Sequence, residues 1–327
     1  MNGPQPITEK LLEGILAGNR AALARGITLV ESKKDSDQEI AASLIEGCIP
    51  GAGKSLRIGV TGVPGAGKST LIEQLGLLLI ALGHRVAVLA VDPSSRISKG
   101  SILGDKTRME KLSLSTQAFI RPSPAGETLG GVARTTRESI LLCEAAGFDV
   151  ILVETVGVGQ SETAVYDLVD FFLLLQLTGA GDELQGIKRG IIEMADAIVI
   201  NKAEGNNRDN ALKTKGMLEI SMHYYPEKPG GWKPQVLLCS ALEGSGLEDL
   251  WDLIQEFKKL GMQSGTLLEN RRNQNIKWFQ QSLDAGLRDY FYRNPRYQKT
   301  FDALQRMVQD GSISPFRAAG QLLSQLE

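Results

Sequence analysis

The chain has 327 residues, of which 42% are hydrophobic and 23% are charged, and its formal net charge is −2. This composition is ordinary for a globular protein, and the length predicts one large α/β domain with helical additions. The near-neutral charge gives no support for a surface that binds nucleic acid. No stretch approaches the ~20 apolar residues that cross a membrane, and the polar N-terminus lacks the core of a signal peptide. We therefore expect a cytoplasmic protein without nucleic-acid or membrane partners.

The cysteines and histidines do not form a recognisable metal or disulfide pattern. The three cysteines, Cys48, Cys143 and Cys239, are scattered and odd in number, so we expect no disulfide framework. His84 and His223 are far apart and have no cysteine neighbours at metal-ligand spacing, which favours structural roles for both.

Residues 1–55 are predicted to be helical. Apolar residues recur there at helical spacing: Leu11, Leu12, Ile15, Leu16, Ala22, Leu23, Ile40, Leu44 and Ile45. The charged stretch 32–38 divides this region in two. We interpret it as an N-terminal helical extension.

The central motif of the chain is a complete G-x-x-x-x-G-K-[ST] phosphate loop. It consists of Gly62, Val63, Pro64, Gly65, Ala66, Gly67, Lys68, Ser69 and Thr70. The apolar run 56–60 before it predicts a buried strand, and leucines at helical spacing after it predict a helix. In this context the loop amides and the helix N-terminus bind phosphate, Lys68 reaches the β- and γ-phosphates, and the Ser69 hydroxyl ligates Mg²⁺.

A truncated copy of this motif stands just before the first strand. The stretch 51–55 reads Gly-Ala-Gly-Lys-Ser, but Cys48 occupies the position of its first required glycine. A strand, not a helix, follows Ser55, so its amides cannot converge on a phosphate. We interpret Lys54 and Ser55 as a polar lead-in to the strand.

From Leu56 onwards, short apolar runs alternate with amphipathic stretches. The predicted strands are Leu56–Val60, Arg85–Val91, Ala118–Arg121, Val150–Glu154, Phe171–Gln176, Ala197–Ile200 and Gln235–Cys239. The predicted helices are Lys68–Leu82, Gly130–Ala146, Gln185–Met194, Arg208–His223 and Leu247–Leu260. This alternation predicts a doubly wound, mainly parallel sheet whose ligands bind beyond the carboxyl ends of the strands.

Two acidic segments at these ends are candidates for the metal site and the phosphate switch. Asp92 ends the second strand, where a carboxylate holds Mg²⁺ directly or through water, and the charged loop after it carries Asp105. Glu154 ends the fourth strand and stands where P-loop proteins keep an acid–x–x–Gly step, so Gly157 is placed to meet a γ-phosphate. Gln160 follows three residues later as a candidate for orienting the attacking water. Val158, not the glutamine of small GTPases, follows Gly157 directly. We therefore expect slow intrinsic hydrolysis of the nucleotide that a partner or dimerisation accelerates.

The last two strands end in short motifs that recognise guanine. Asn201-Lys202-Ala203-Glu204 corresponds to N-K-x-D, whose acid accepts hydrogen bonds from N1–H and the 2-amino group of guanine. Glu204 is one methylene longer than the usual Asp. The run Ser240, Ala241 and Leu242 matches the S-A-x element that supports the base.

The C-terminal residues 262–327 lose the strand pattern and form helical stripes. Trp278, Phe279, Leu283, Leu287, Tyr290 and Phe291 make one stripe, and Phe301, Leu304, Met307 and Val308 make a second. Such a tail needs a packing partner, which is either the chain's own sheet or a second copy in a homodimer. The predicted organisation is therefore a helical extension at 1–55, a P-loop domain at 56–261 and a helical arm at 262–327.

Several long motifs together resemble the MeaB/ArgK family. They are Gly62–Thr70, 91–95 (VDPSS), 100–108 (GSILGDKTR), 154–162 (ETVGVGQSE), 184–188 (LQGIK) and Asn201–Lys202, and the resemblance extends over about residues 10–325. The family is made up of GTPases of the P-loop class that includes the urease and hydrogenase nickel-insertion GTPases, which implies a SIMIBI-like G domain. It is homodimeric through a C-terminal helical arm, which favours the dimer for this chain.

The resemblance implies a function in protecting methylmalonyl-CoA mutase, an adenosylcobalamin enzyme, and in gating its cofactor loading by GTP hydrolysis to GDP. By position, it implies that Lys68, Ser69 and Thr70 serve phosphate and metal, and that Asp92, Asp105 and Glu154 supply the Mg²⁺ shell. Asn201, Lys202 and Glu204 would bind the base. Residues 185–188 would belong to a further switch that senses the nucleotide and contacts the partner.

Three other functions are considered. A P-loop kinase that phosphorylates a protein partner would need an acceptor site or catalytic base, and nothing in the chain looks like one. A nickel-inserting GTPase needs His or Cys ligands that two histidines and three dispersed cysteines do not supply. A nucleotide-dependent binding module with negligible turnover remains an alternative, because Val158 replaces the glutamine that small GTPases place after the glycine.

Overall fold

The computed structural model describes residues 4–91, 109–123, 129–155, 161–178 and 189–324. Within these ranges seven strands form one parallel sheet in the order β3-β2-β4-β1-β5-β6-β7. The strands are β1 Leu56–Gly62, β2 Val86–Val91, β3 Ala118–Ser123, β4 Val150–Thr155, β5 Phe171–Gln176, β6 Ala197–Ile200 and β7 Gln235–Leu238. The predicted doubly wound parallel sheet is therefore confirmed.

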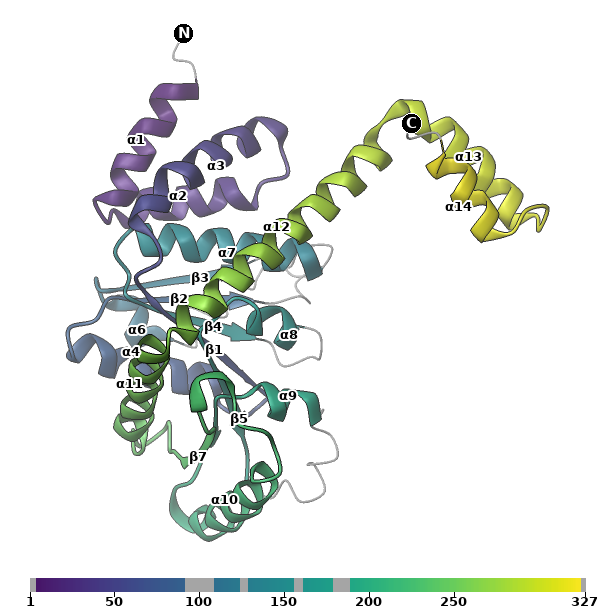
Figure 1. Ribbon diagram of the computed structural model, residues 1–327. Helices are drawn as coiled ribbons and strands as arrows, with labels where there is room; N and C mark the ends of the chain where they lie inside the picture. The colour runs from purple at the N-terminus through teal and green to yellow at the C-terminus, as the bar shows by residue number, and fades with distance from the viewer. Residues whose placement is uncertain (1–3, 92–108, 124–128, 156–160, 179–188, 325–327) are drawn as a thin grey trace. The chain divides into compact units, whose positions relative to one another are not determined.

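The two faces of the sheet are buried by different helices (Figure 1). One face packs against α4 Lys68–Ala81, α6 Glu110–Leu114 and α11 Leu247–Ser264. The other packs against α7 Leu129–Ala145 and α8 Ser161–Tyr166. Because both faces are covered, β2, β4 and β5 are buried along their whole length, and this is why they appear in the sequence as continuous apolar runs.

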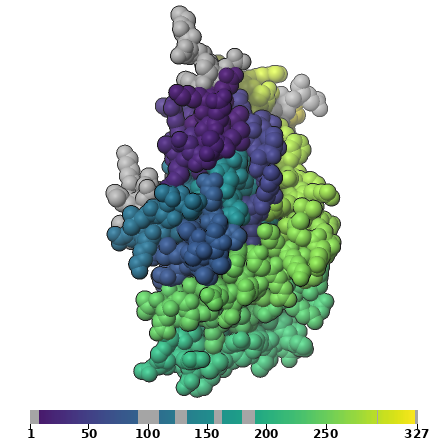
Figure 2. All heavy atoms as spheres, turned by 90° about the vertical axis from the view of Figure 1, so that its left-hand side faces the viewer, coloured from purple at the N-terminus to yellow at the C-terminus, as the bar shows by residue number. Residues whose placement is uncertain are grey.

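Three helices precede the sheet and pack on α7. They are α1 Pro4–Leu16, α2 Arg20–Glu31 and α3 Asp35–Cys48, followed by the short turn η1 Ile49–Gly51. Ile15, Leu23 and Ile27 share one buried cluster with Phe148 and Phe172 of the sheet domain. Figure 2 shows these N-terminal helices, in purple, directly against the blue and teal residues of that domain. The helical extension is therefore part of the fold's hydrophobic core.

The far edge of the sheet, β5 to β7, is covered by α9 Arg189–Met194 and α10 Arg208–Met222. Short turns η3 Gly205–Asn207 and η4 Pro229–Gly231 flank α10. The predicted helix 185–194 lies partly outside the described residues, and α9 is the part that is described. The short helices α6 and α8 were not predicted.

The strand register brings the sequence motifs to one edge of the sheet. β1 lies between β4 and β5, with Val60 opposite Glu154 and Gly62 opposite Leu175. β6 and β7 follow on the β5 side, so Asn201 and Ser240 come after strands that end at the same edge. The carboxyl ends of the strands therefore gather the phosphate loop, Glu154 and the N-K-A-E segment.

The chain divides into two compact units, residues 1–274 and 275–327. The first unit contains the N-terminal helices, the sheet and the first turns of α12 Thr266–Arg293. The second contains the rest of α12, α13 Pro295–Gln309 and α14 Pro315–Leu323, and has a small core around Leu304, Ala318 and Leu322. All three elements are helical, as the sequence predicts for 262–327.

Candidate functional site

The phosphate loop joins β1 to α4 through a backbone that requires glycine at two positions. Gly62 has φ 148°, and a Cβ there would lie 2.4 Å from the Leu175 carbonyl oxygen. Gly67 has φ 89°, and its Cβ would lie 2.5 Å from Asn201 Nδ2. Residue 67 precedes the first turn of α4, so the unpaired amides of that turn adjoin the loop. This is the geometry of an anion site at a helix N-terminus.

Lys68 folds back over the loop that precedes it. Its Nζ donates hydrogen bonds to the carbonyl oxygens of Gly62 at 2.8 Å and Val63 at 3.2 Å. Burial lowers the pKa of Lys68 below its ordinary value, while the charges of Glu154 and Glu162 act in the opposite direction. The ammonium group is thus held by carbonyl oxygens of the loop, within the electrostatic influence of Glu154 and Glu162.

Ser69 and Glu154 meet beside the loop. The Ser69 hydroxyl donates to Glu154 Oε1 at 2.9 Å, and Glu154 is 9% exposed. Below them, Thr155 Oγ1 donates to Thr61 Oγ1 at 2.9 Å, which ties β4 to β1. A hydroxyl and a carboxylate are the hard oxygen donors that Mg²⁺ prefers. The structure therefore brings together two of the four predicted metal ligands.

The other predicted ligands and switch residues lie outside the described residues. These are Asp92, Asp105, Gly157, Gln160 and residues 185–188. Within the described part of the chain, no group of three or more His, Cys, Asp or Glu residues is arranged to hold a metal ion.

Asn201 connects the phosphate loop to the loop that follows β7. Its Nδ2 donates to the Ala66 carbonyl oxygen at 2.8 Å, and its Oδ1 accepts from the Ala241 N–H at 3.0 Å. The side chain is 1% exposed. One buried amide therefore links residues 66 and 241.

The segment after Asn201 contains the residues that are predicted to bind the base. Lys202 has φ 59°, the one positive φ among the described non-glycine residues, and it is exposed. The Ala203 N–H donates to the Cys239 carbonyl oxygen at 3.1 Å, which holds the loops after β6 and β7 together. Ser240 and Ala241 are buried, whereas Leu242 is 77% exposed.

Glu204 carries a buried carboxylate oxygen at this end of the site. Its Oε2 is inaccessible and has no hydrogen-bond partner among the described residues. Burial, with a smaller contribution from the charge of Glu204, raises the pKa of the neighbouring Cys239 thiol to about 12. A buried carboxylate oxygen without a partner is costly, and the N1–H and 2-amino donors of guanine would satisfy it.

Three residues of the site were not predicted from the sequence. Glu162 is 3% exposed at the start of α8 and acts electrostatically on Lys68. It belongs to the motif 154–162, which the sequence analysis singled out, but the sequence did not indicate a role for this residue. Thr61 and Thr155 are hydroxyls inside otherwise apolar strands, and pairing between them depends on the β1–β4 register, which the sequence alone does not supply.

The truncated motif at 51–55, His84 and the cysteines make contacts within the fold. Residues 53 and 55 contact Glu144 on α7 rather than forming a second loop. His84 Nδ1 lies 2.6 Å from Asp149 Oδ2 and its ring packs edge-on against Trp251. The three cysteines are free and buried.

Comparison with known proteins identifies close relatives over nearly the whole chain. GTPase ArgK of Escherichia coli is 46% identical and the match covers 93% of this chain and 92% of ArgK. The mitochondrial methylmalonic aciduria type A homolog of Mus musculus is 45% identical over 98% of this chain and 79% of the relative. A crystal structure described as LAO/AO transport system kinase superposes with a TM-score of 0.77 at 38% identity, covering 100% of this chain and 99% of that one.

None of the helices in the described ranges is both long and apolar enough to span a membrane.

The same relationship appears at the level of the family. The sequence model of the family described as methylmalonyl Co-A mutase-associated GTPase MeaB matches residues 23–295, which include the phosphate loop, the N-K-A-E segment and α12. The chain therefore belongs to the MeaB family and is a P-loop GTPase that binds guanine nucleotides.

Proposed function

We propose that this GTPase is a chaperone of an adenosylcobalamin-dependent methylmalonyl-CoA mutase, which it protects and whose cofactor loading it gates by GTP hydrolysis. The family match over residues 23–295 carries this proposal, because the family description names that mutase as the associated enzyme. The mouse relative, named for methylmalonic aciduria, supports the same association.

The site residues take the following roles in this proposal. The amides of residues 62–70 and Lys68 bind the phosphates, and Asn201, Lys202, Glu204 and the segment 240–242 bind guanine. Ser69 and Glu154, together with Asp92 and Asp105, would hold Mg²⁺. When bound, this ion offsets the negative charge that builds up between the β- and γ-phosphates. Gly157 and Gln160 would meet the γ-phosphate and the attacking water, and residues 185–188 would form a further switch.

The experiment that tests this role measures, by absorbance, how adenosylcobalamin is loaded into the mutase. Adenosylcobalamin loading of the cofactor-free mutase is measured with GTP, GDP or no nucleotide. We expect loading to depend on the nucleotide in the wild type and in Lys54→Ala, because Lys54 is exposed in the truncated motif. The dependence should disappear in Lys68→Ala. Loading that is the same in all three nucleotide conditions would exclude the gating role.

A protein kinase is the second candidate, because a structure 38% identical to this chain is described as a transport system kinase. Radiolabelled γ-phosphate distinguishes the two functions. The chaperone releases the label as inorganic phosphate, whereas a kinase leaves it covalently attached to a protein.

A homodimer formed through the C-terminal helices completes the proposal. Several of the exposed apolar side chains of α12 lie along one stripe: Ile276, Phe279, Leu283, Leu287 and Tyr290. They recur at intervals of three, four, four and three residues along one helix, as in a helix–helix seam. A contiguous apolar surface of this kind marks an interface, and a second copy of the same helix matches it.

A further inference from the structure

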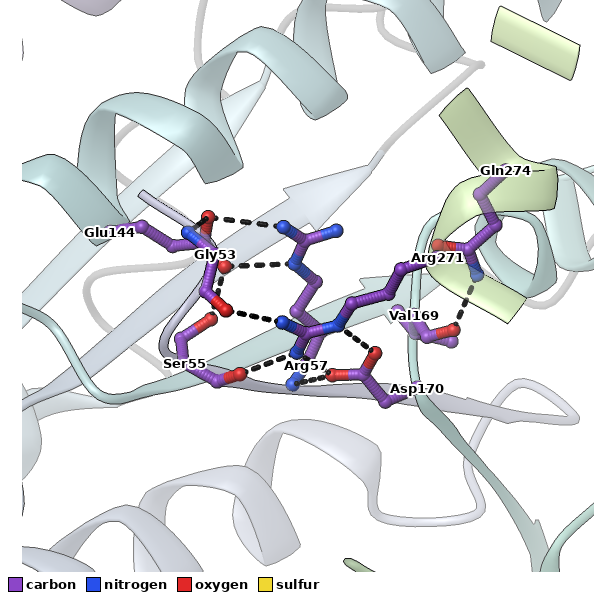
Figure 3. A network of polar contacts seen from close by, with 8 residues as sticks. All are labelled: Gly53, Ser55, Arg57, Glu144, Val169, Asp170, Arg271 and Gln274. Carbon is purple, nitrogen blue, oxygen red and sulfur yellow. Dashed lines mark hydrogen bonds and ion pairs between the residues drawn. The ribbon is translucent and has the colours of Figure 1, made fainter. Parts of the chain in front are cut away.

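A dense polar network lies at the amino ends of β1 and β5, at the opposite end of these strands from the phosphate loop (Figure 3). We call it the basal clamp and define it as the side chains of Arg57, Glu144, Asp170 and Arg271 with the backbone of Gly53 and Ser55. Two of these residues, Gly53 and Ser55, belong to the truncated motif at 51–55. The clamp shows which contacts this segment makes.

Arg271, on the first turns of α12, is the centre of the clamp. Its Nε and Nη2 donate to the two oxygens of Asp170 at 2.7 and 2.5 Å. Nη1 and Nη2 also donate to the carbonyl oxygens of Gly53 and Ser55, both at 2.6 Å. Figure 3 shows the guanidinium between the carboxylate on one side and these two carbonyls on the other. The planar fork of arginine suits this two-sided arrangement, and the point charge of lysine does not.

Glu144 on α7 holds the same segment from its other side. Its carboxylate accepts from Arg57 Nε and Nη2 at 2.9 and 3.0 Å, from the Ser55 hydroxyl at 2.5 Å and from the Gly53 N–H at 2.7 Å. The Arg57 N–H in turn donates to Asp170 Oδ2 at 2.9 Å. Residues 53–57 are therefore gripped between α7 and α12 immediately before β1 begins.

The clamp is buried, so its charges depend on one another. The side chain of Asp170 is 0% exposed and that of Glu144 is 1% exposed, whereas those of Arg271 and Arg57 retain 12% and 16%. Removing one partner of such a pair leaves the other as an uncompensated buried charge. The two carboxylates thus hold α7, α12 and the starts of β1 and β5 in one relative arrangement. Any other arrangement of these elements would leave a buried charge unpaired.

A second connection reaches the clamp through α8. Gln274 Nε2 donates to the Val169 carbonyl oxygen at 2.8 Å, and Arg137 donates to the carbonyl oxygens of Gln274 and Asp167 at 2.6 and 2.9 Å. Residues 167–170 connect α8 to β5, and Glu162 at the other end of α8 acts on Lys68. The first turns of α12 are therefore attached both to the segment that enters β1 and to the segment that follows α8.

We propose that Arg271 couples the nucleotide site to α12, so that a change of nucleotide alters how firmly the first turns of this helix are held. β1 is an extended strand of seven residues, about 20 Å long, with the phosphate loop at one end and the clamp at the other. α12 continues into the second compact unit. This deepens the proposed function, because it supplies the path by which the nucleotide would act on the C-terminal helices.

Hydrogen exchange of the full-length protein tests the coupling. Amide exchange in residues 266–274 is compared between GDP and a non-hydrolysable GTP analogue, for the wild type, Arg271→Gln and Arg272→Gln. The control residue Arg272 is the adjacent, exposed arginine of the same helix. Without nucleotide, we expect exchange in 266–274 to be at least about tenfold faster in Arg271→Gln than in the control.

The decisive quantity is the difference in the amide exchange rate of residues 266–274 between the GDP state and the GTP-analogue state. We expect this difference in the wild type and in Arg272→Gln, and we expect it to be lost in Arg271→Gln. Since coupling is reciprocal, the ratio of affinities for the GTP analogue and GDP must change in Arg271→Gln as well, which a purely structural residue would leave unaltered. Bound GDP confirms that each variant is folded.

Should Arg271→Gln fail to bind GDP, Arg271→Lys carries the test, because it keeps the charge opposite Asp170 and loses only the fork. An equal nucleotide response in the wild type and in the folded Arg271 variant would overturn the proposal, as would the absence of any response in 266–274 of the wild type. The mutase takes no part in this experiment, so its result is independent of the cofactor-transfer assay.

Discussion

At the scale of single residues, two buried polar side chains of the candidate site have two hydrogen-bond partners each. Lys68 is held by two carbonyl oxygens, and Asn201 joins Ala66 to Ala241. Glu204 has a buried oxygen with no partner within the described ranges. In the proposed site, the N1–H and 2-amino groups of guanine would be the partners of this oxygen.

Substitution of Asn201 by alanine should disconnect the two halves of the site. It leaves the Ala66 carbonyl and the Ala241 N–H without their partner, at a cost of about 1–3 kcal/mol for each buried group. We expect GDP affinity to fall at least about tenfold, which corresponds to 1.4 kcal/mol. Titration calorimetry measures this, with Asn210→Ala, at an exposed position of α10, as the control. Equal affinities in the two variants would contradict the bridging role.

Glu204→Gln tests the base contact through the number of donors on the ligand. A carboxylate accepts from both N1–H and the 2-amino group, whereas the amide oxygen accepts once and its NH₂ faces a donor. We expect GDP binding to weaken by about 10- to 100-fold. Inosine diphosphate lacks the 2-amino group, so the substitution should weaken its binding less than it weakens the binding of GDP. If both nucleotides lost affinity equally, the 2-amino group would not meet Glu204.

The site residues that the sequence makes most visible are those whose pattern is local. The phosphate loop needs only its own glycines and the strand and helix around it, so its pattern is visible in one stretch of sequence. Thr61, Thr155 and Glu162 could not be predicted, because their partners are supplied by strand register and by the position of α8. Residues 92, 105, 157 and 160 stay predictions.

At the scale of elements, parallel strands determine which loops come together. The predicted strands match the observed ones closely: β5 and β6 have the same bounds, and the others differ by one or two residues at an end. Continuous burial on both faces explains this agreement, because the hydrophobic run ends where the strand leaves the core. The short helices α6 and α8 were missed since five or six residues carry too little periodicity.

The basal clamp gives these elements a pH-dependent contribution to stability. Burial by itself would raise the pKa of Glu144, but the charge of Arg57 and hydrogen bonds from Arg57, Ser55 and Gly53 outweigh it and hold the pKa below its ordinary value of 4.5. The folded state therefore favours the carboxylate. Its stabilisation is present above pH 4.5 and is lost as the pH falls from 4.5 through the lower pKa of the folded state.

Glu144→Gln should flatten this part of the pH profile. Chemical denaturation between pH 7 and pH 3 measures the free energy of unfolding of the wild type and the variant. We expect the variant to be less stable at pH 7, by about 3–5 kcal/mol, because Arg57 loses its buried partner. The gap should narrow below pH 4.5. A constant gap across this range would show that Glu144 is not the titrating group.

At the scale of the whole molecule, the chain combines a compact GTPase unit with a helical unit that exposes apolar surface. The three-part organisation predicted from the sequence remains a proposal. Residues 1–274 pack as one unit that includes the N-terminal helices, because the apolar faces of α1 to α3 join the sheet's own core. The sequence showed those faces but could not show which surface they cover, since any amphipathic helix fits many partners.

The apolar stripe on α12 predicts a homodimer. Light scattering after size exclusion should give the wild type a mass of twice 35.4 kDa. Phe279→Glu with Leu283→Glu should reduce it to a single chain, because two charges would be buried in the seam. Gln280→Glu with Arg288→Glu, at exposed polar positions of the same helix, should leave the dimer intact. A wild type that elutes as a single chain would exclude this interface.

The most direct test of the central claim is hydrolysis of GTP and of ATP, each with and without purified methylmalonyl-CoA mutase, with Lys68→Ala as the control. The site geometry and the family predict turnover of GTP but not of ATP, an increase when the mutase is added, and no turnover in Lys68→Ala. Equal hydrolysis of ATP would contradict the role of Glu204 in choosing guanine. GTP hydrolysis that does not respond to the mutase would contradict the proposed partnership and leave a GTPase with another client.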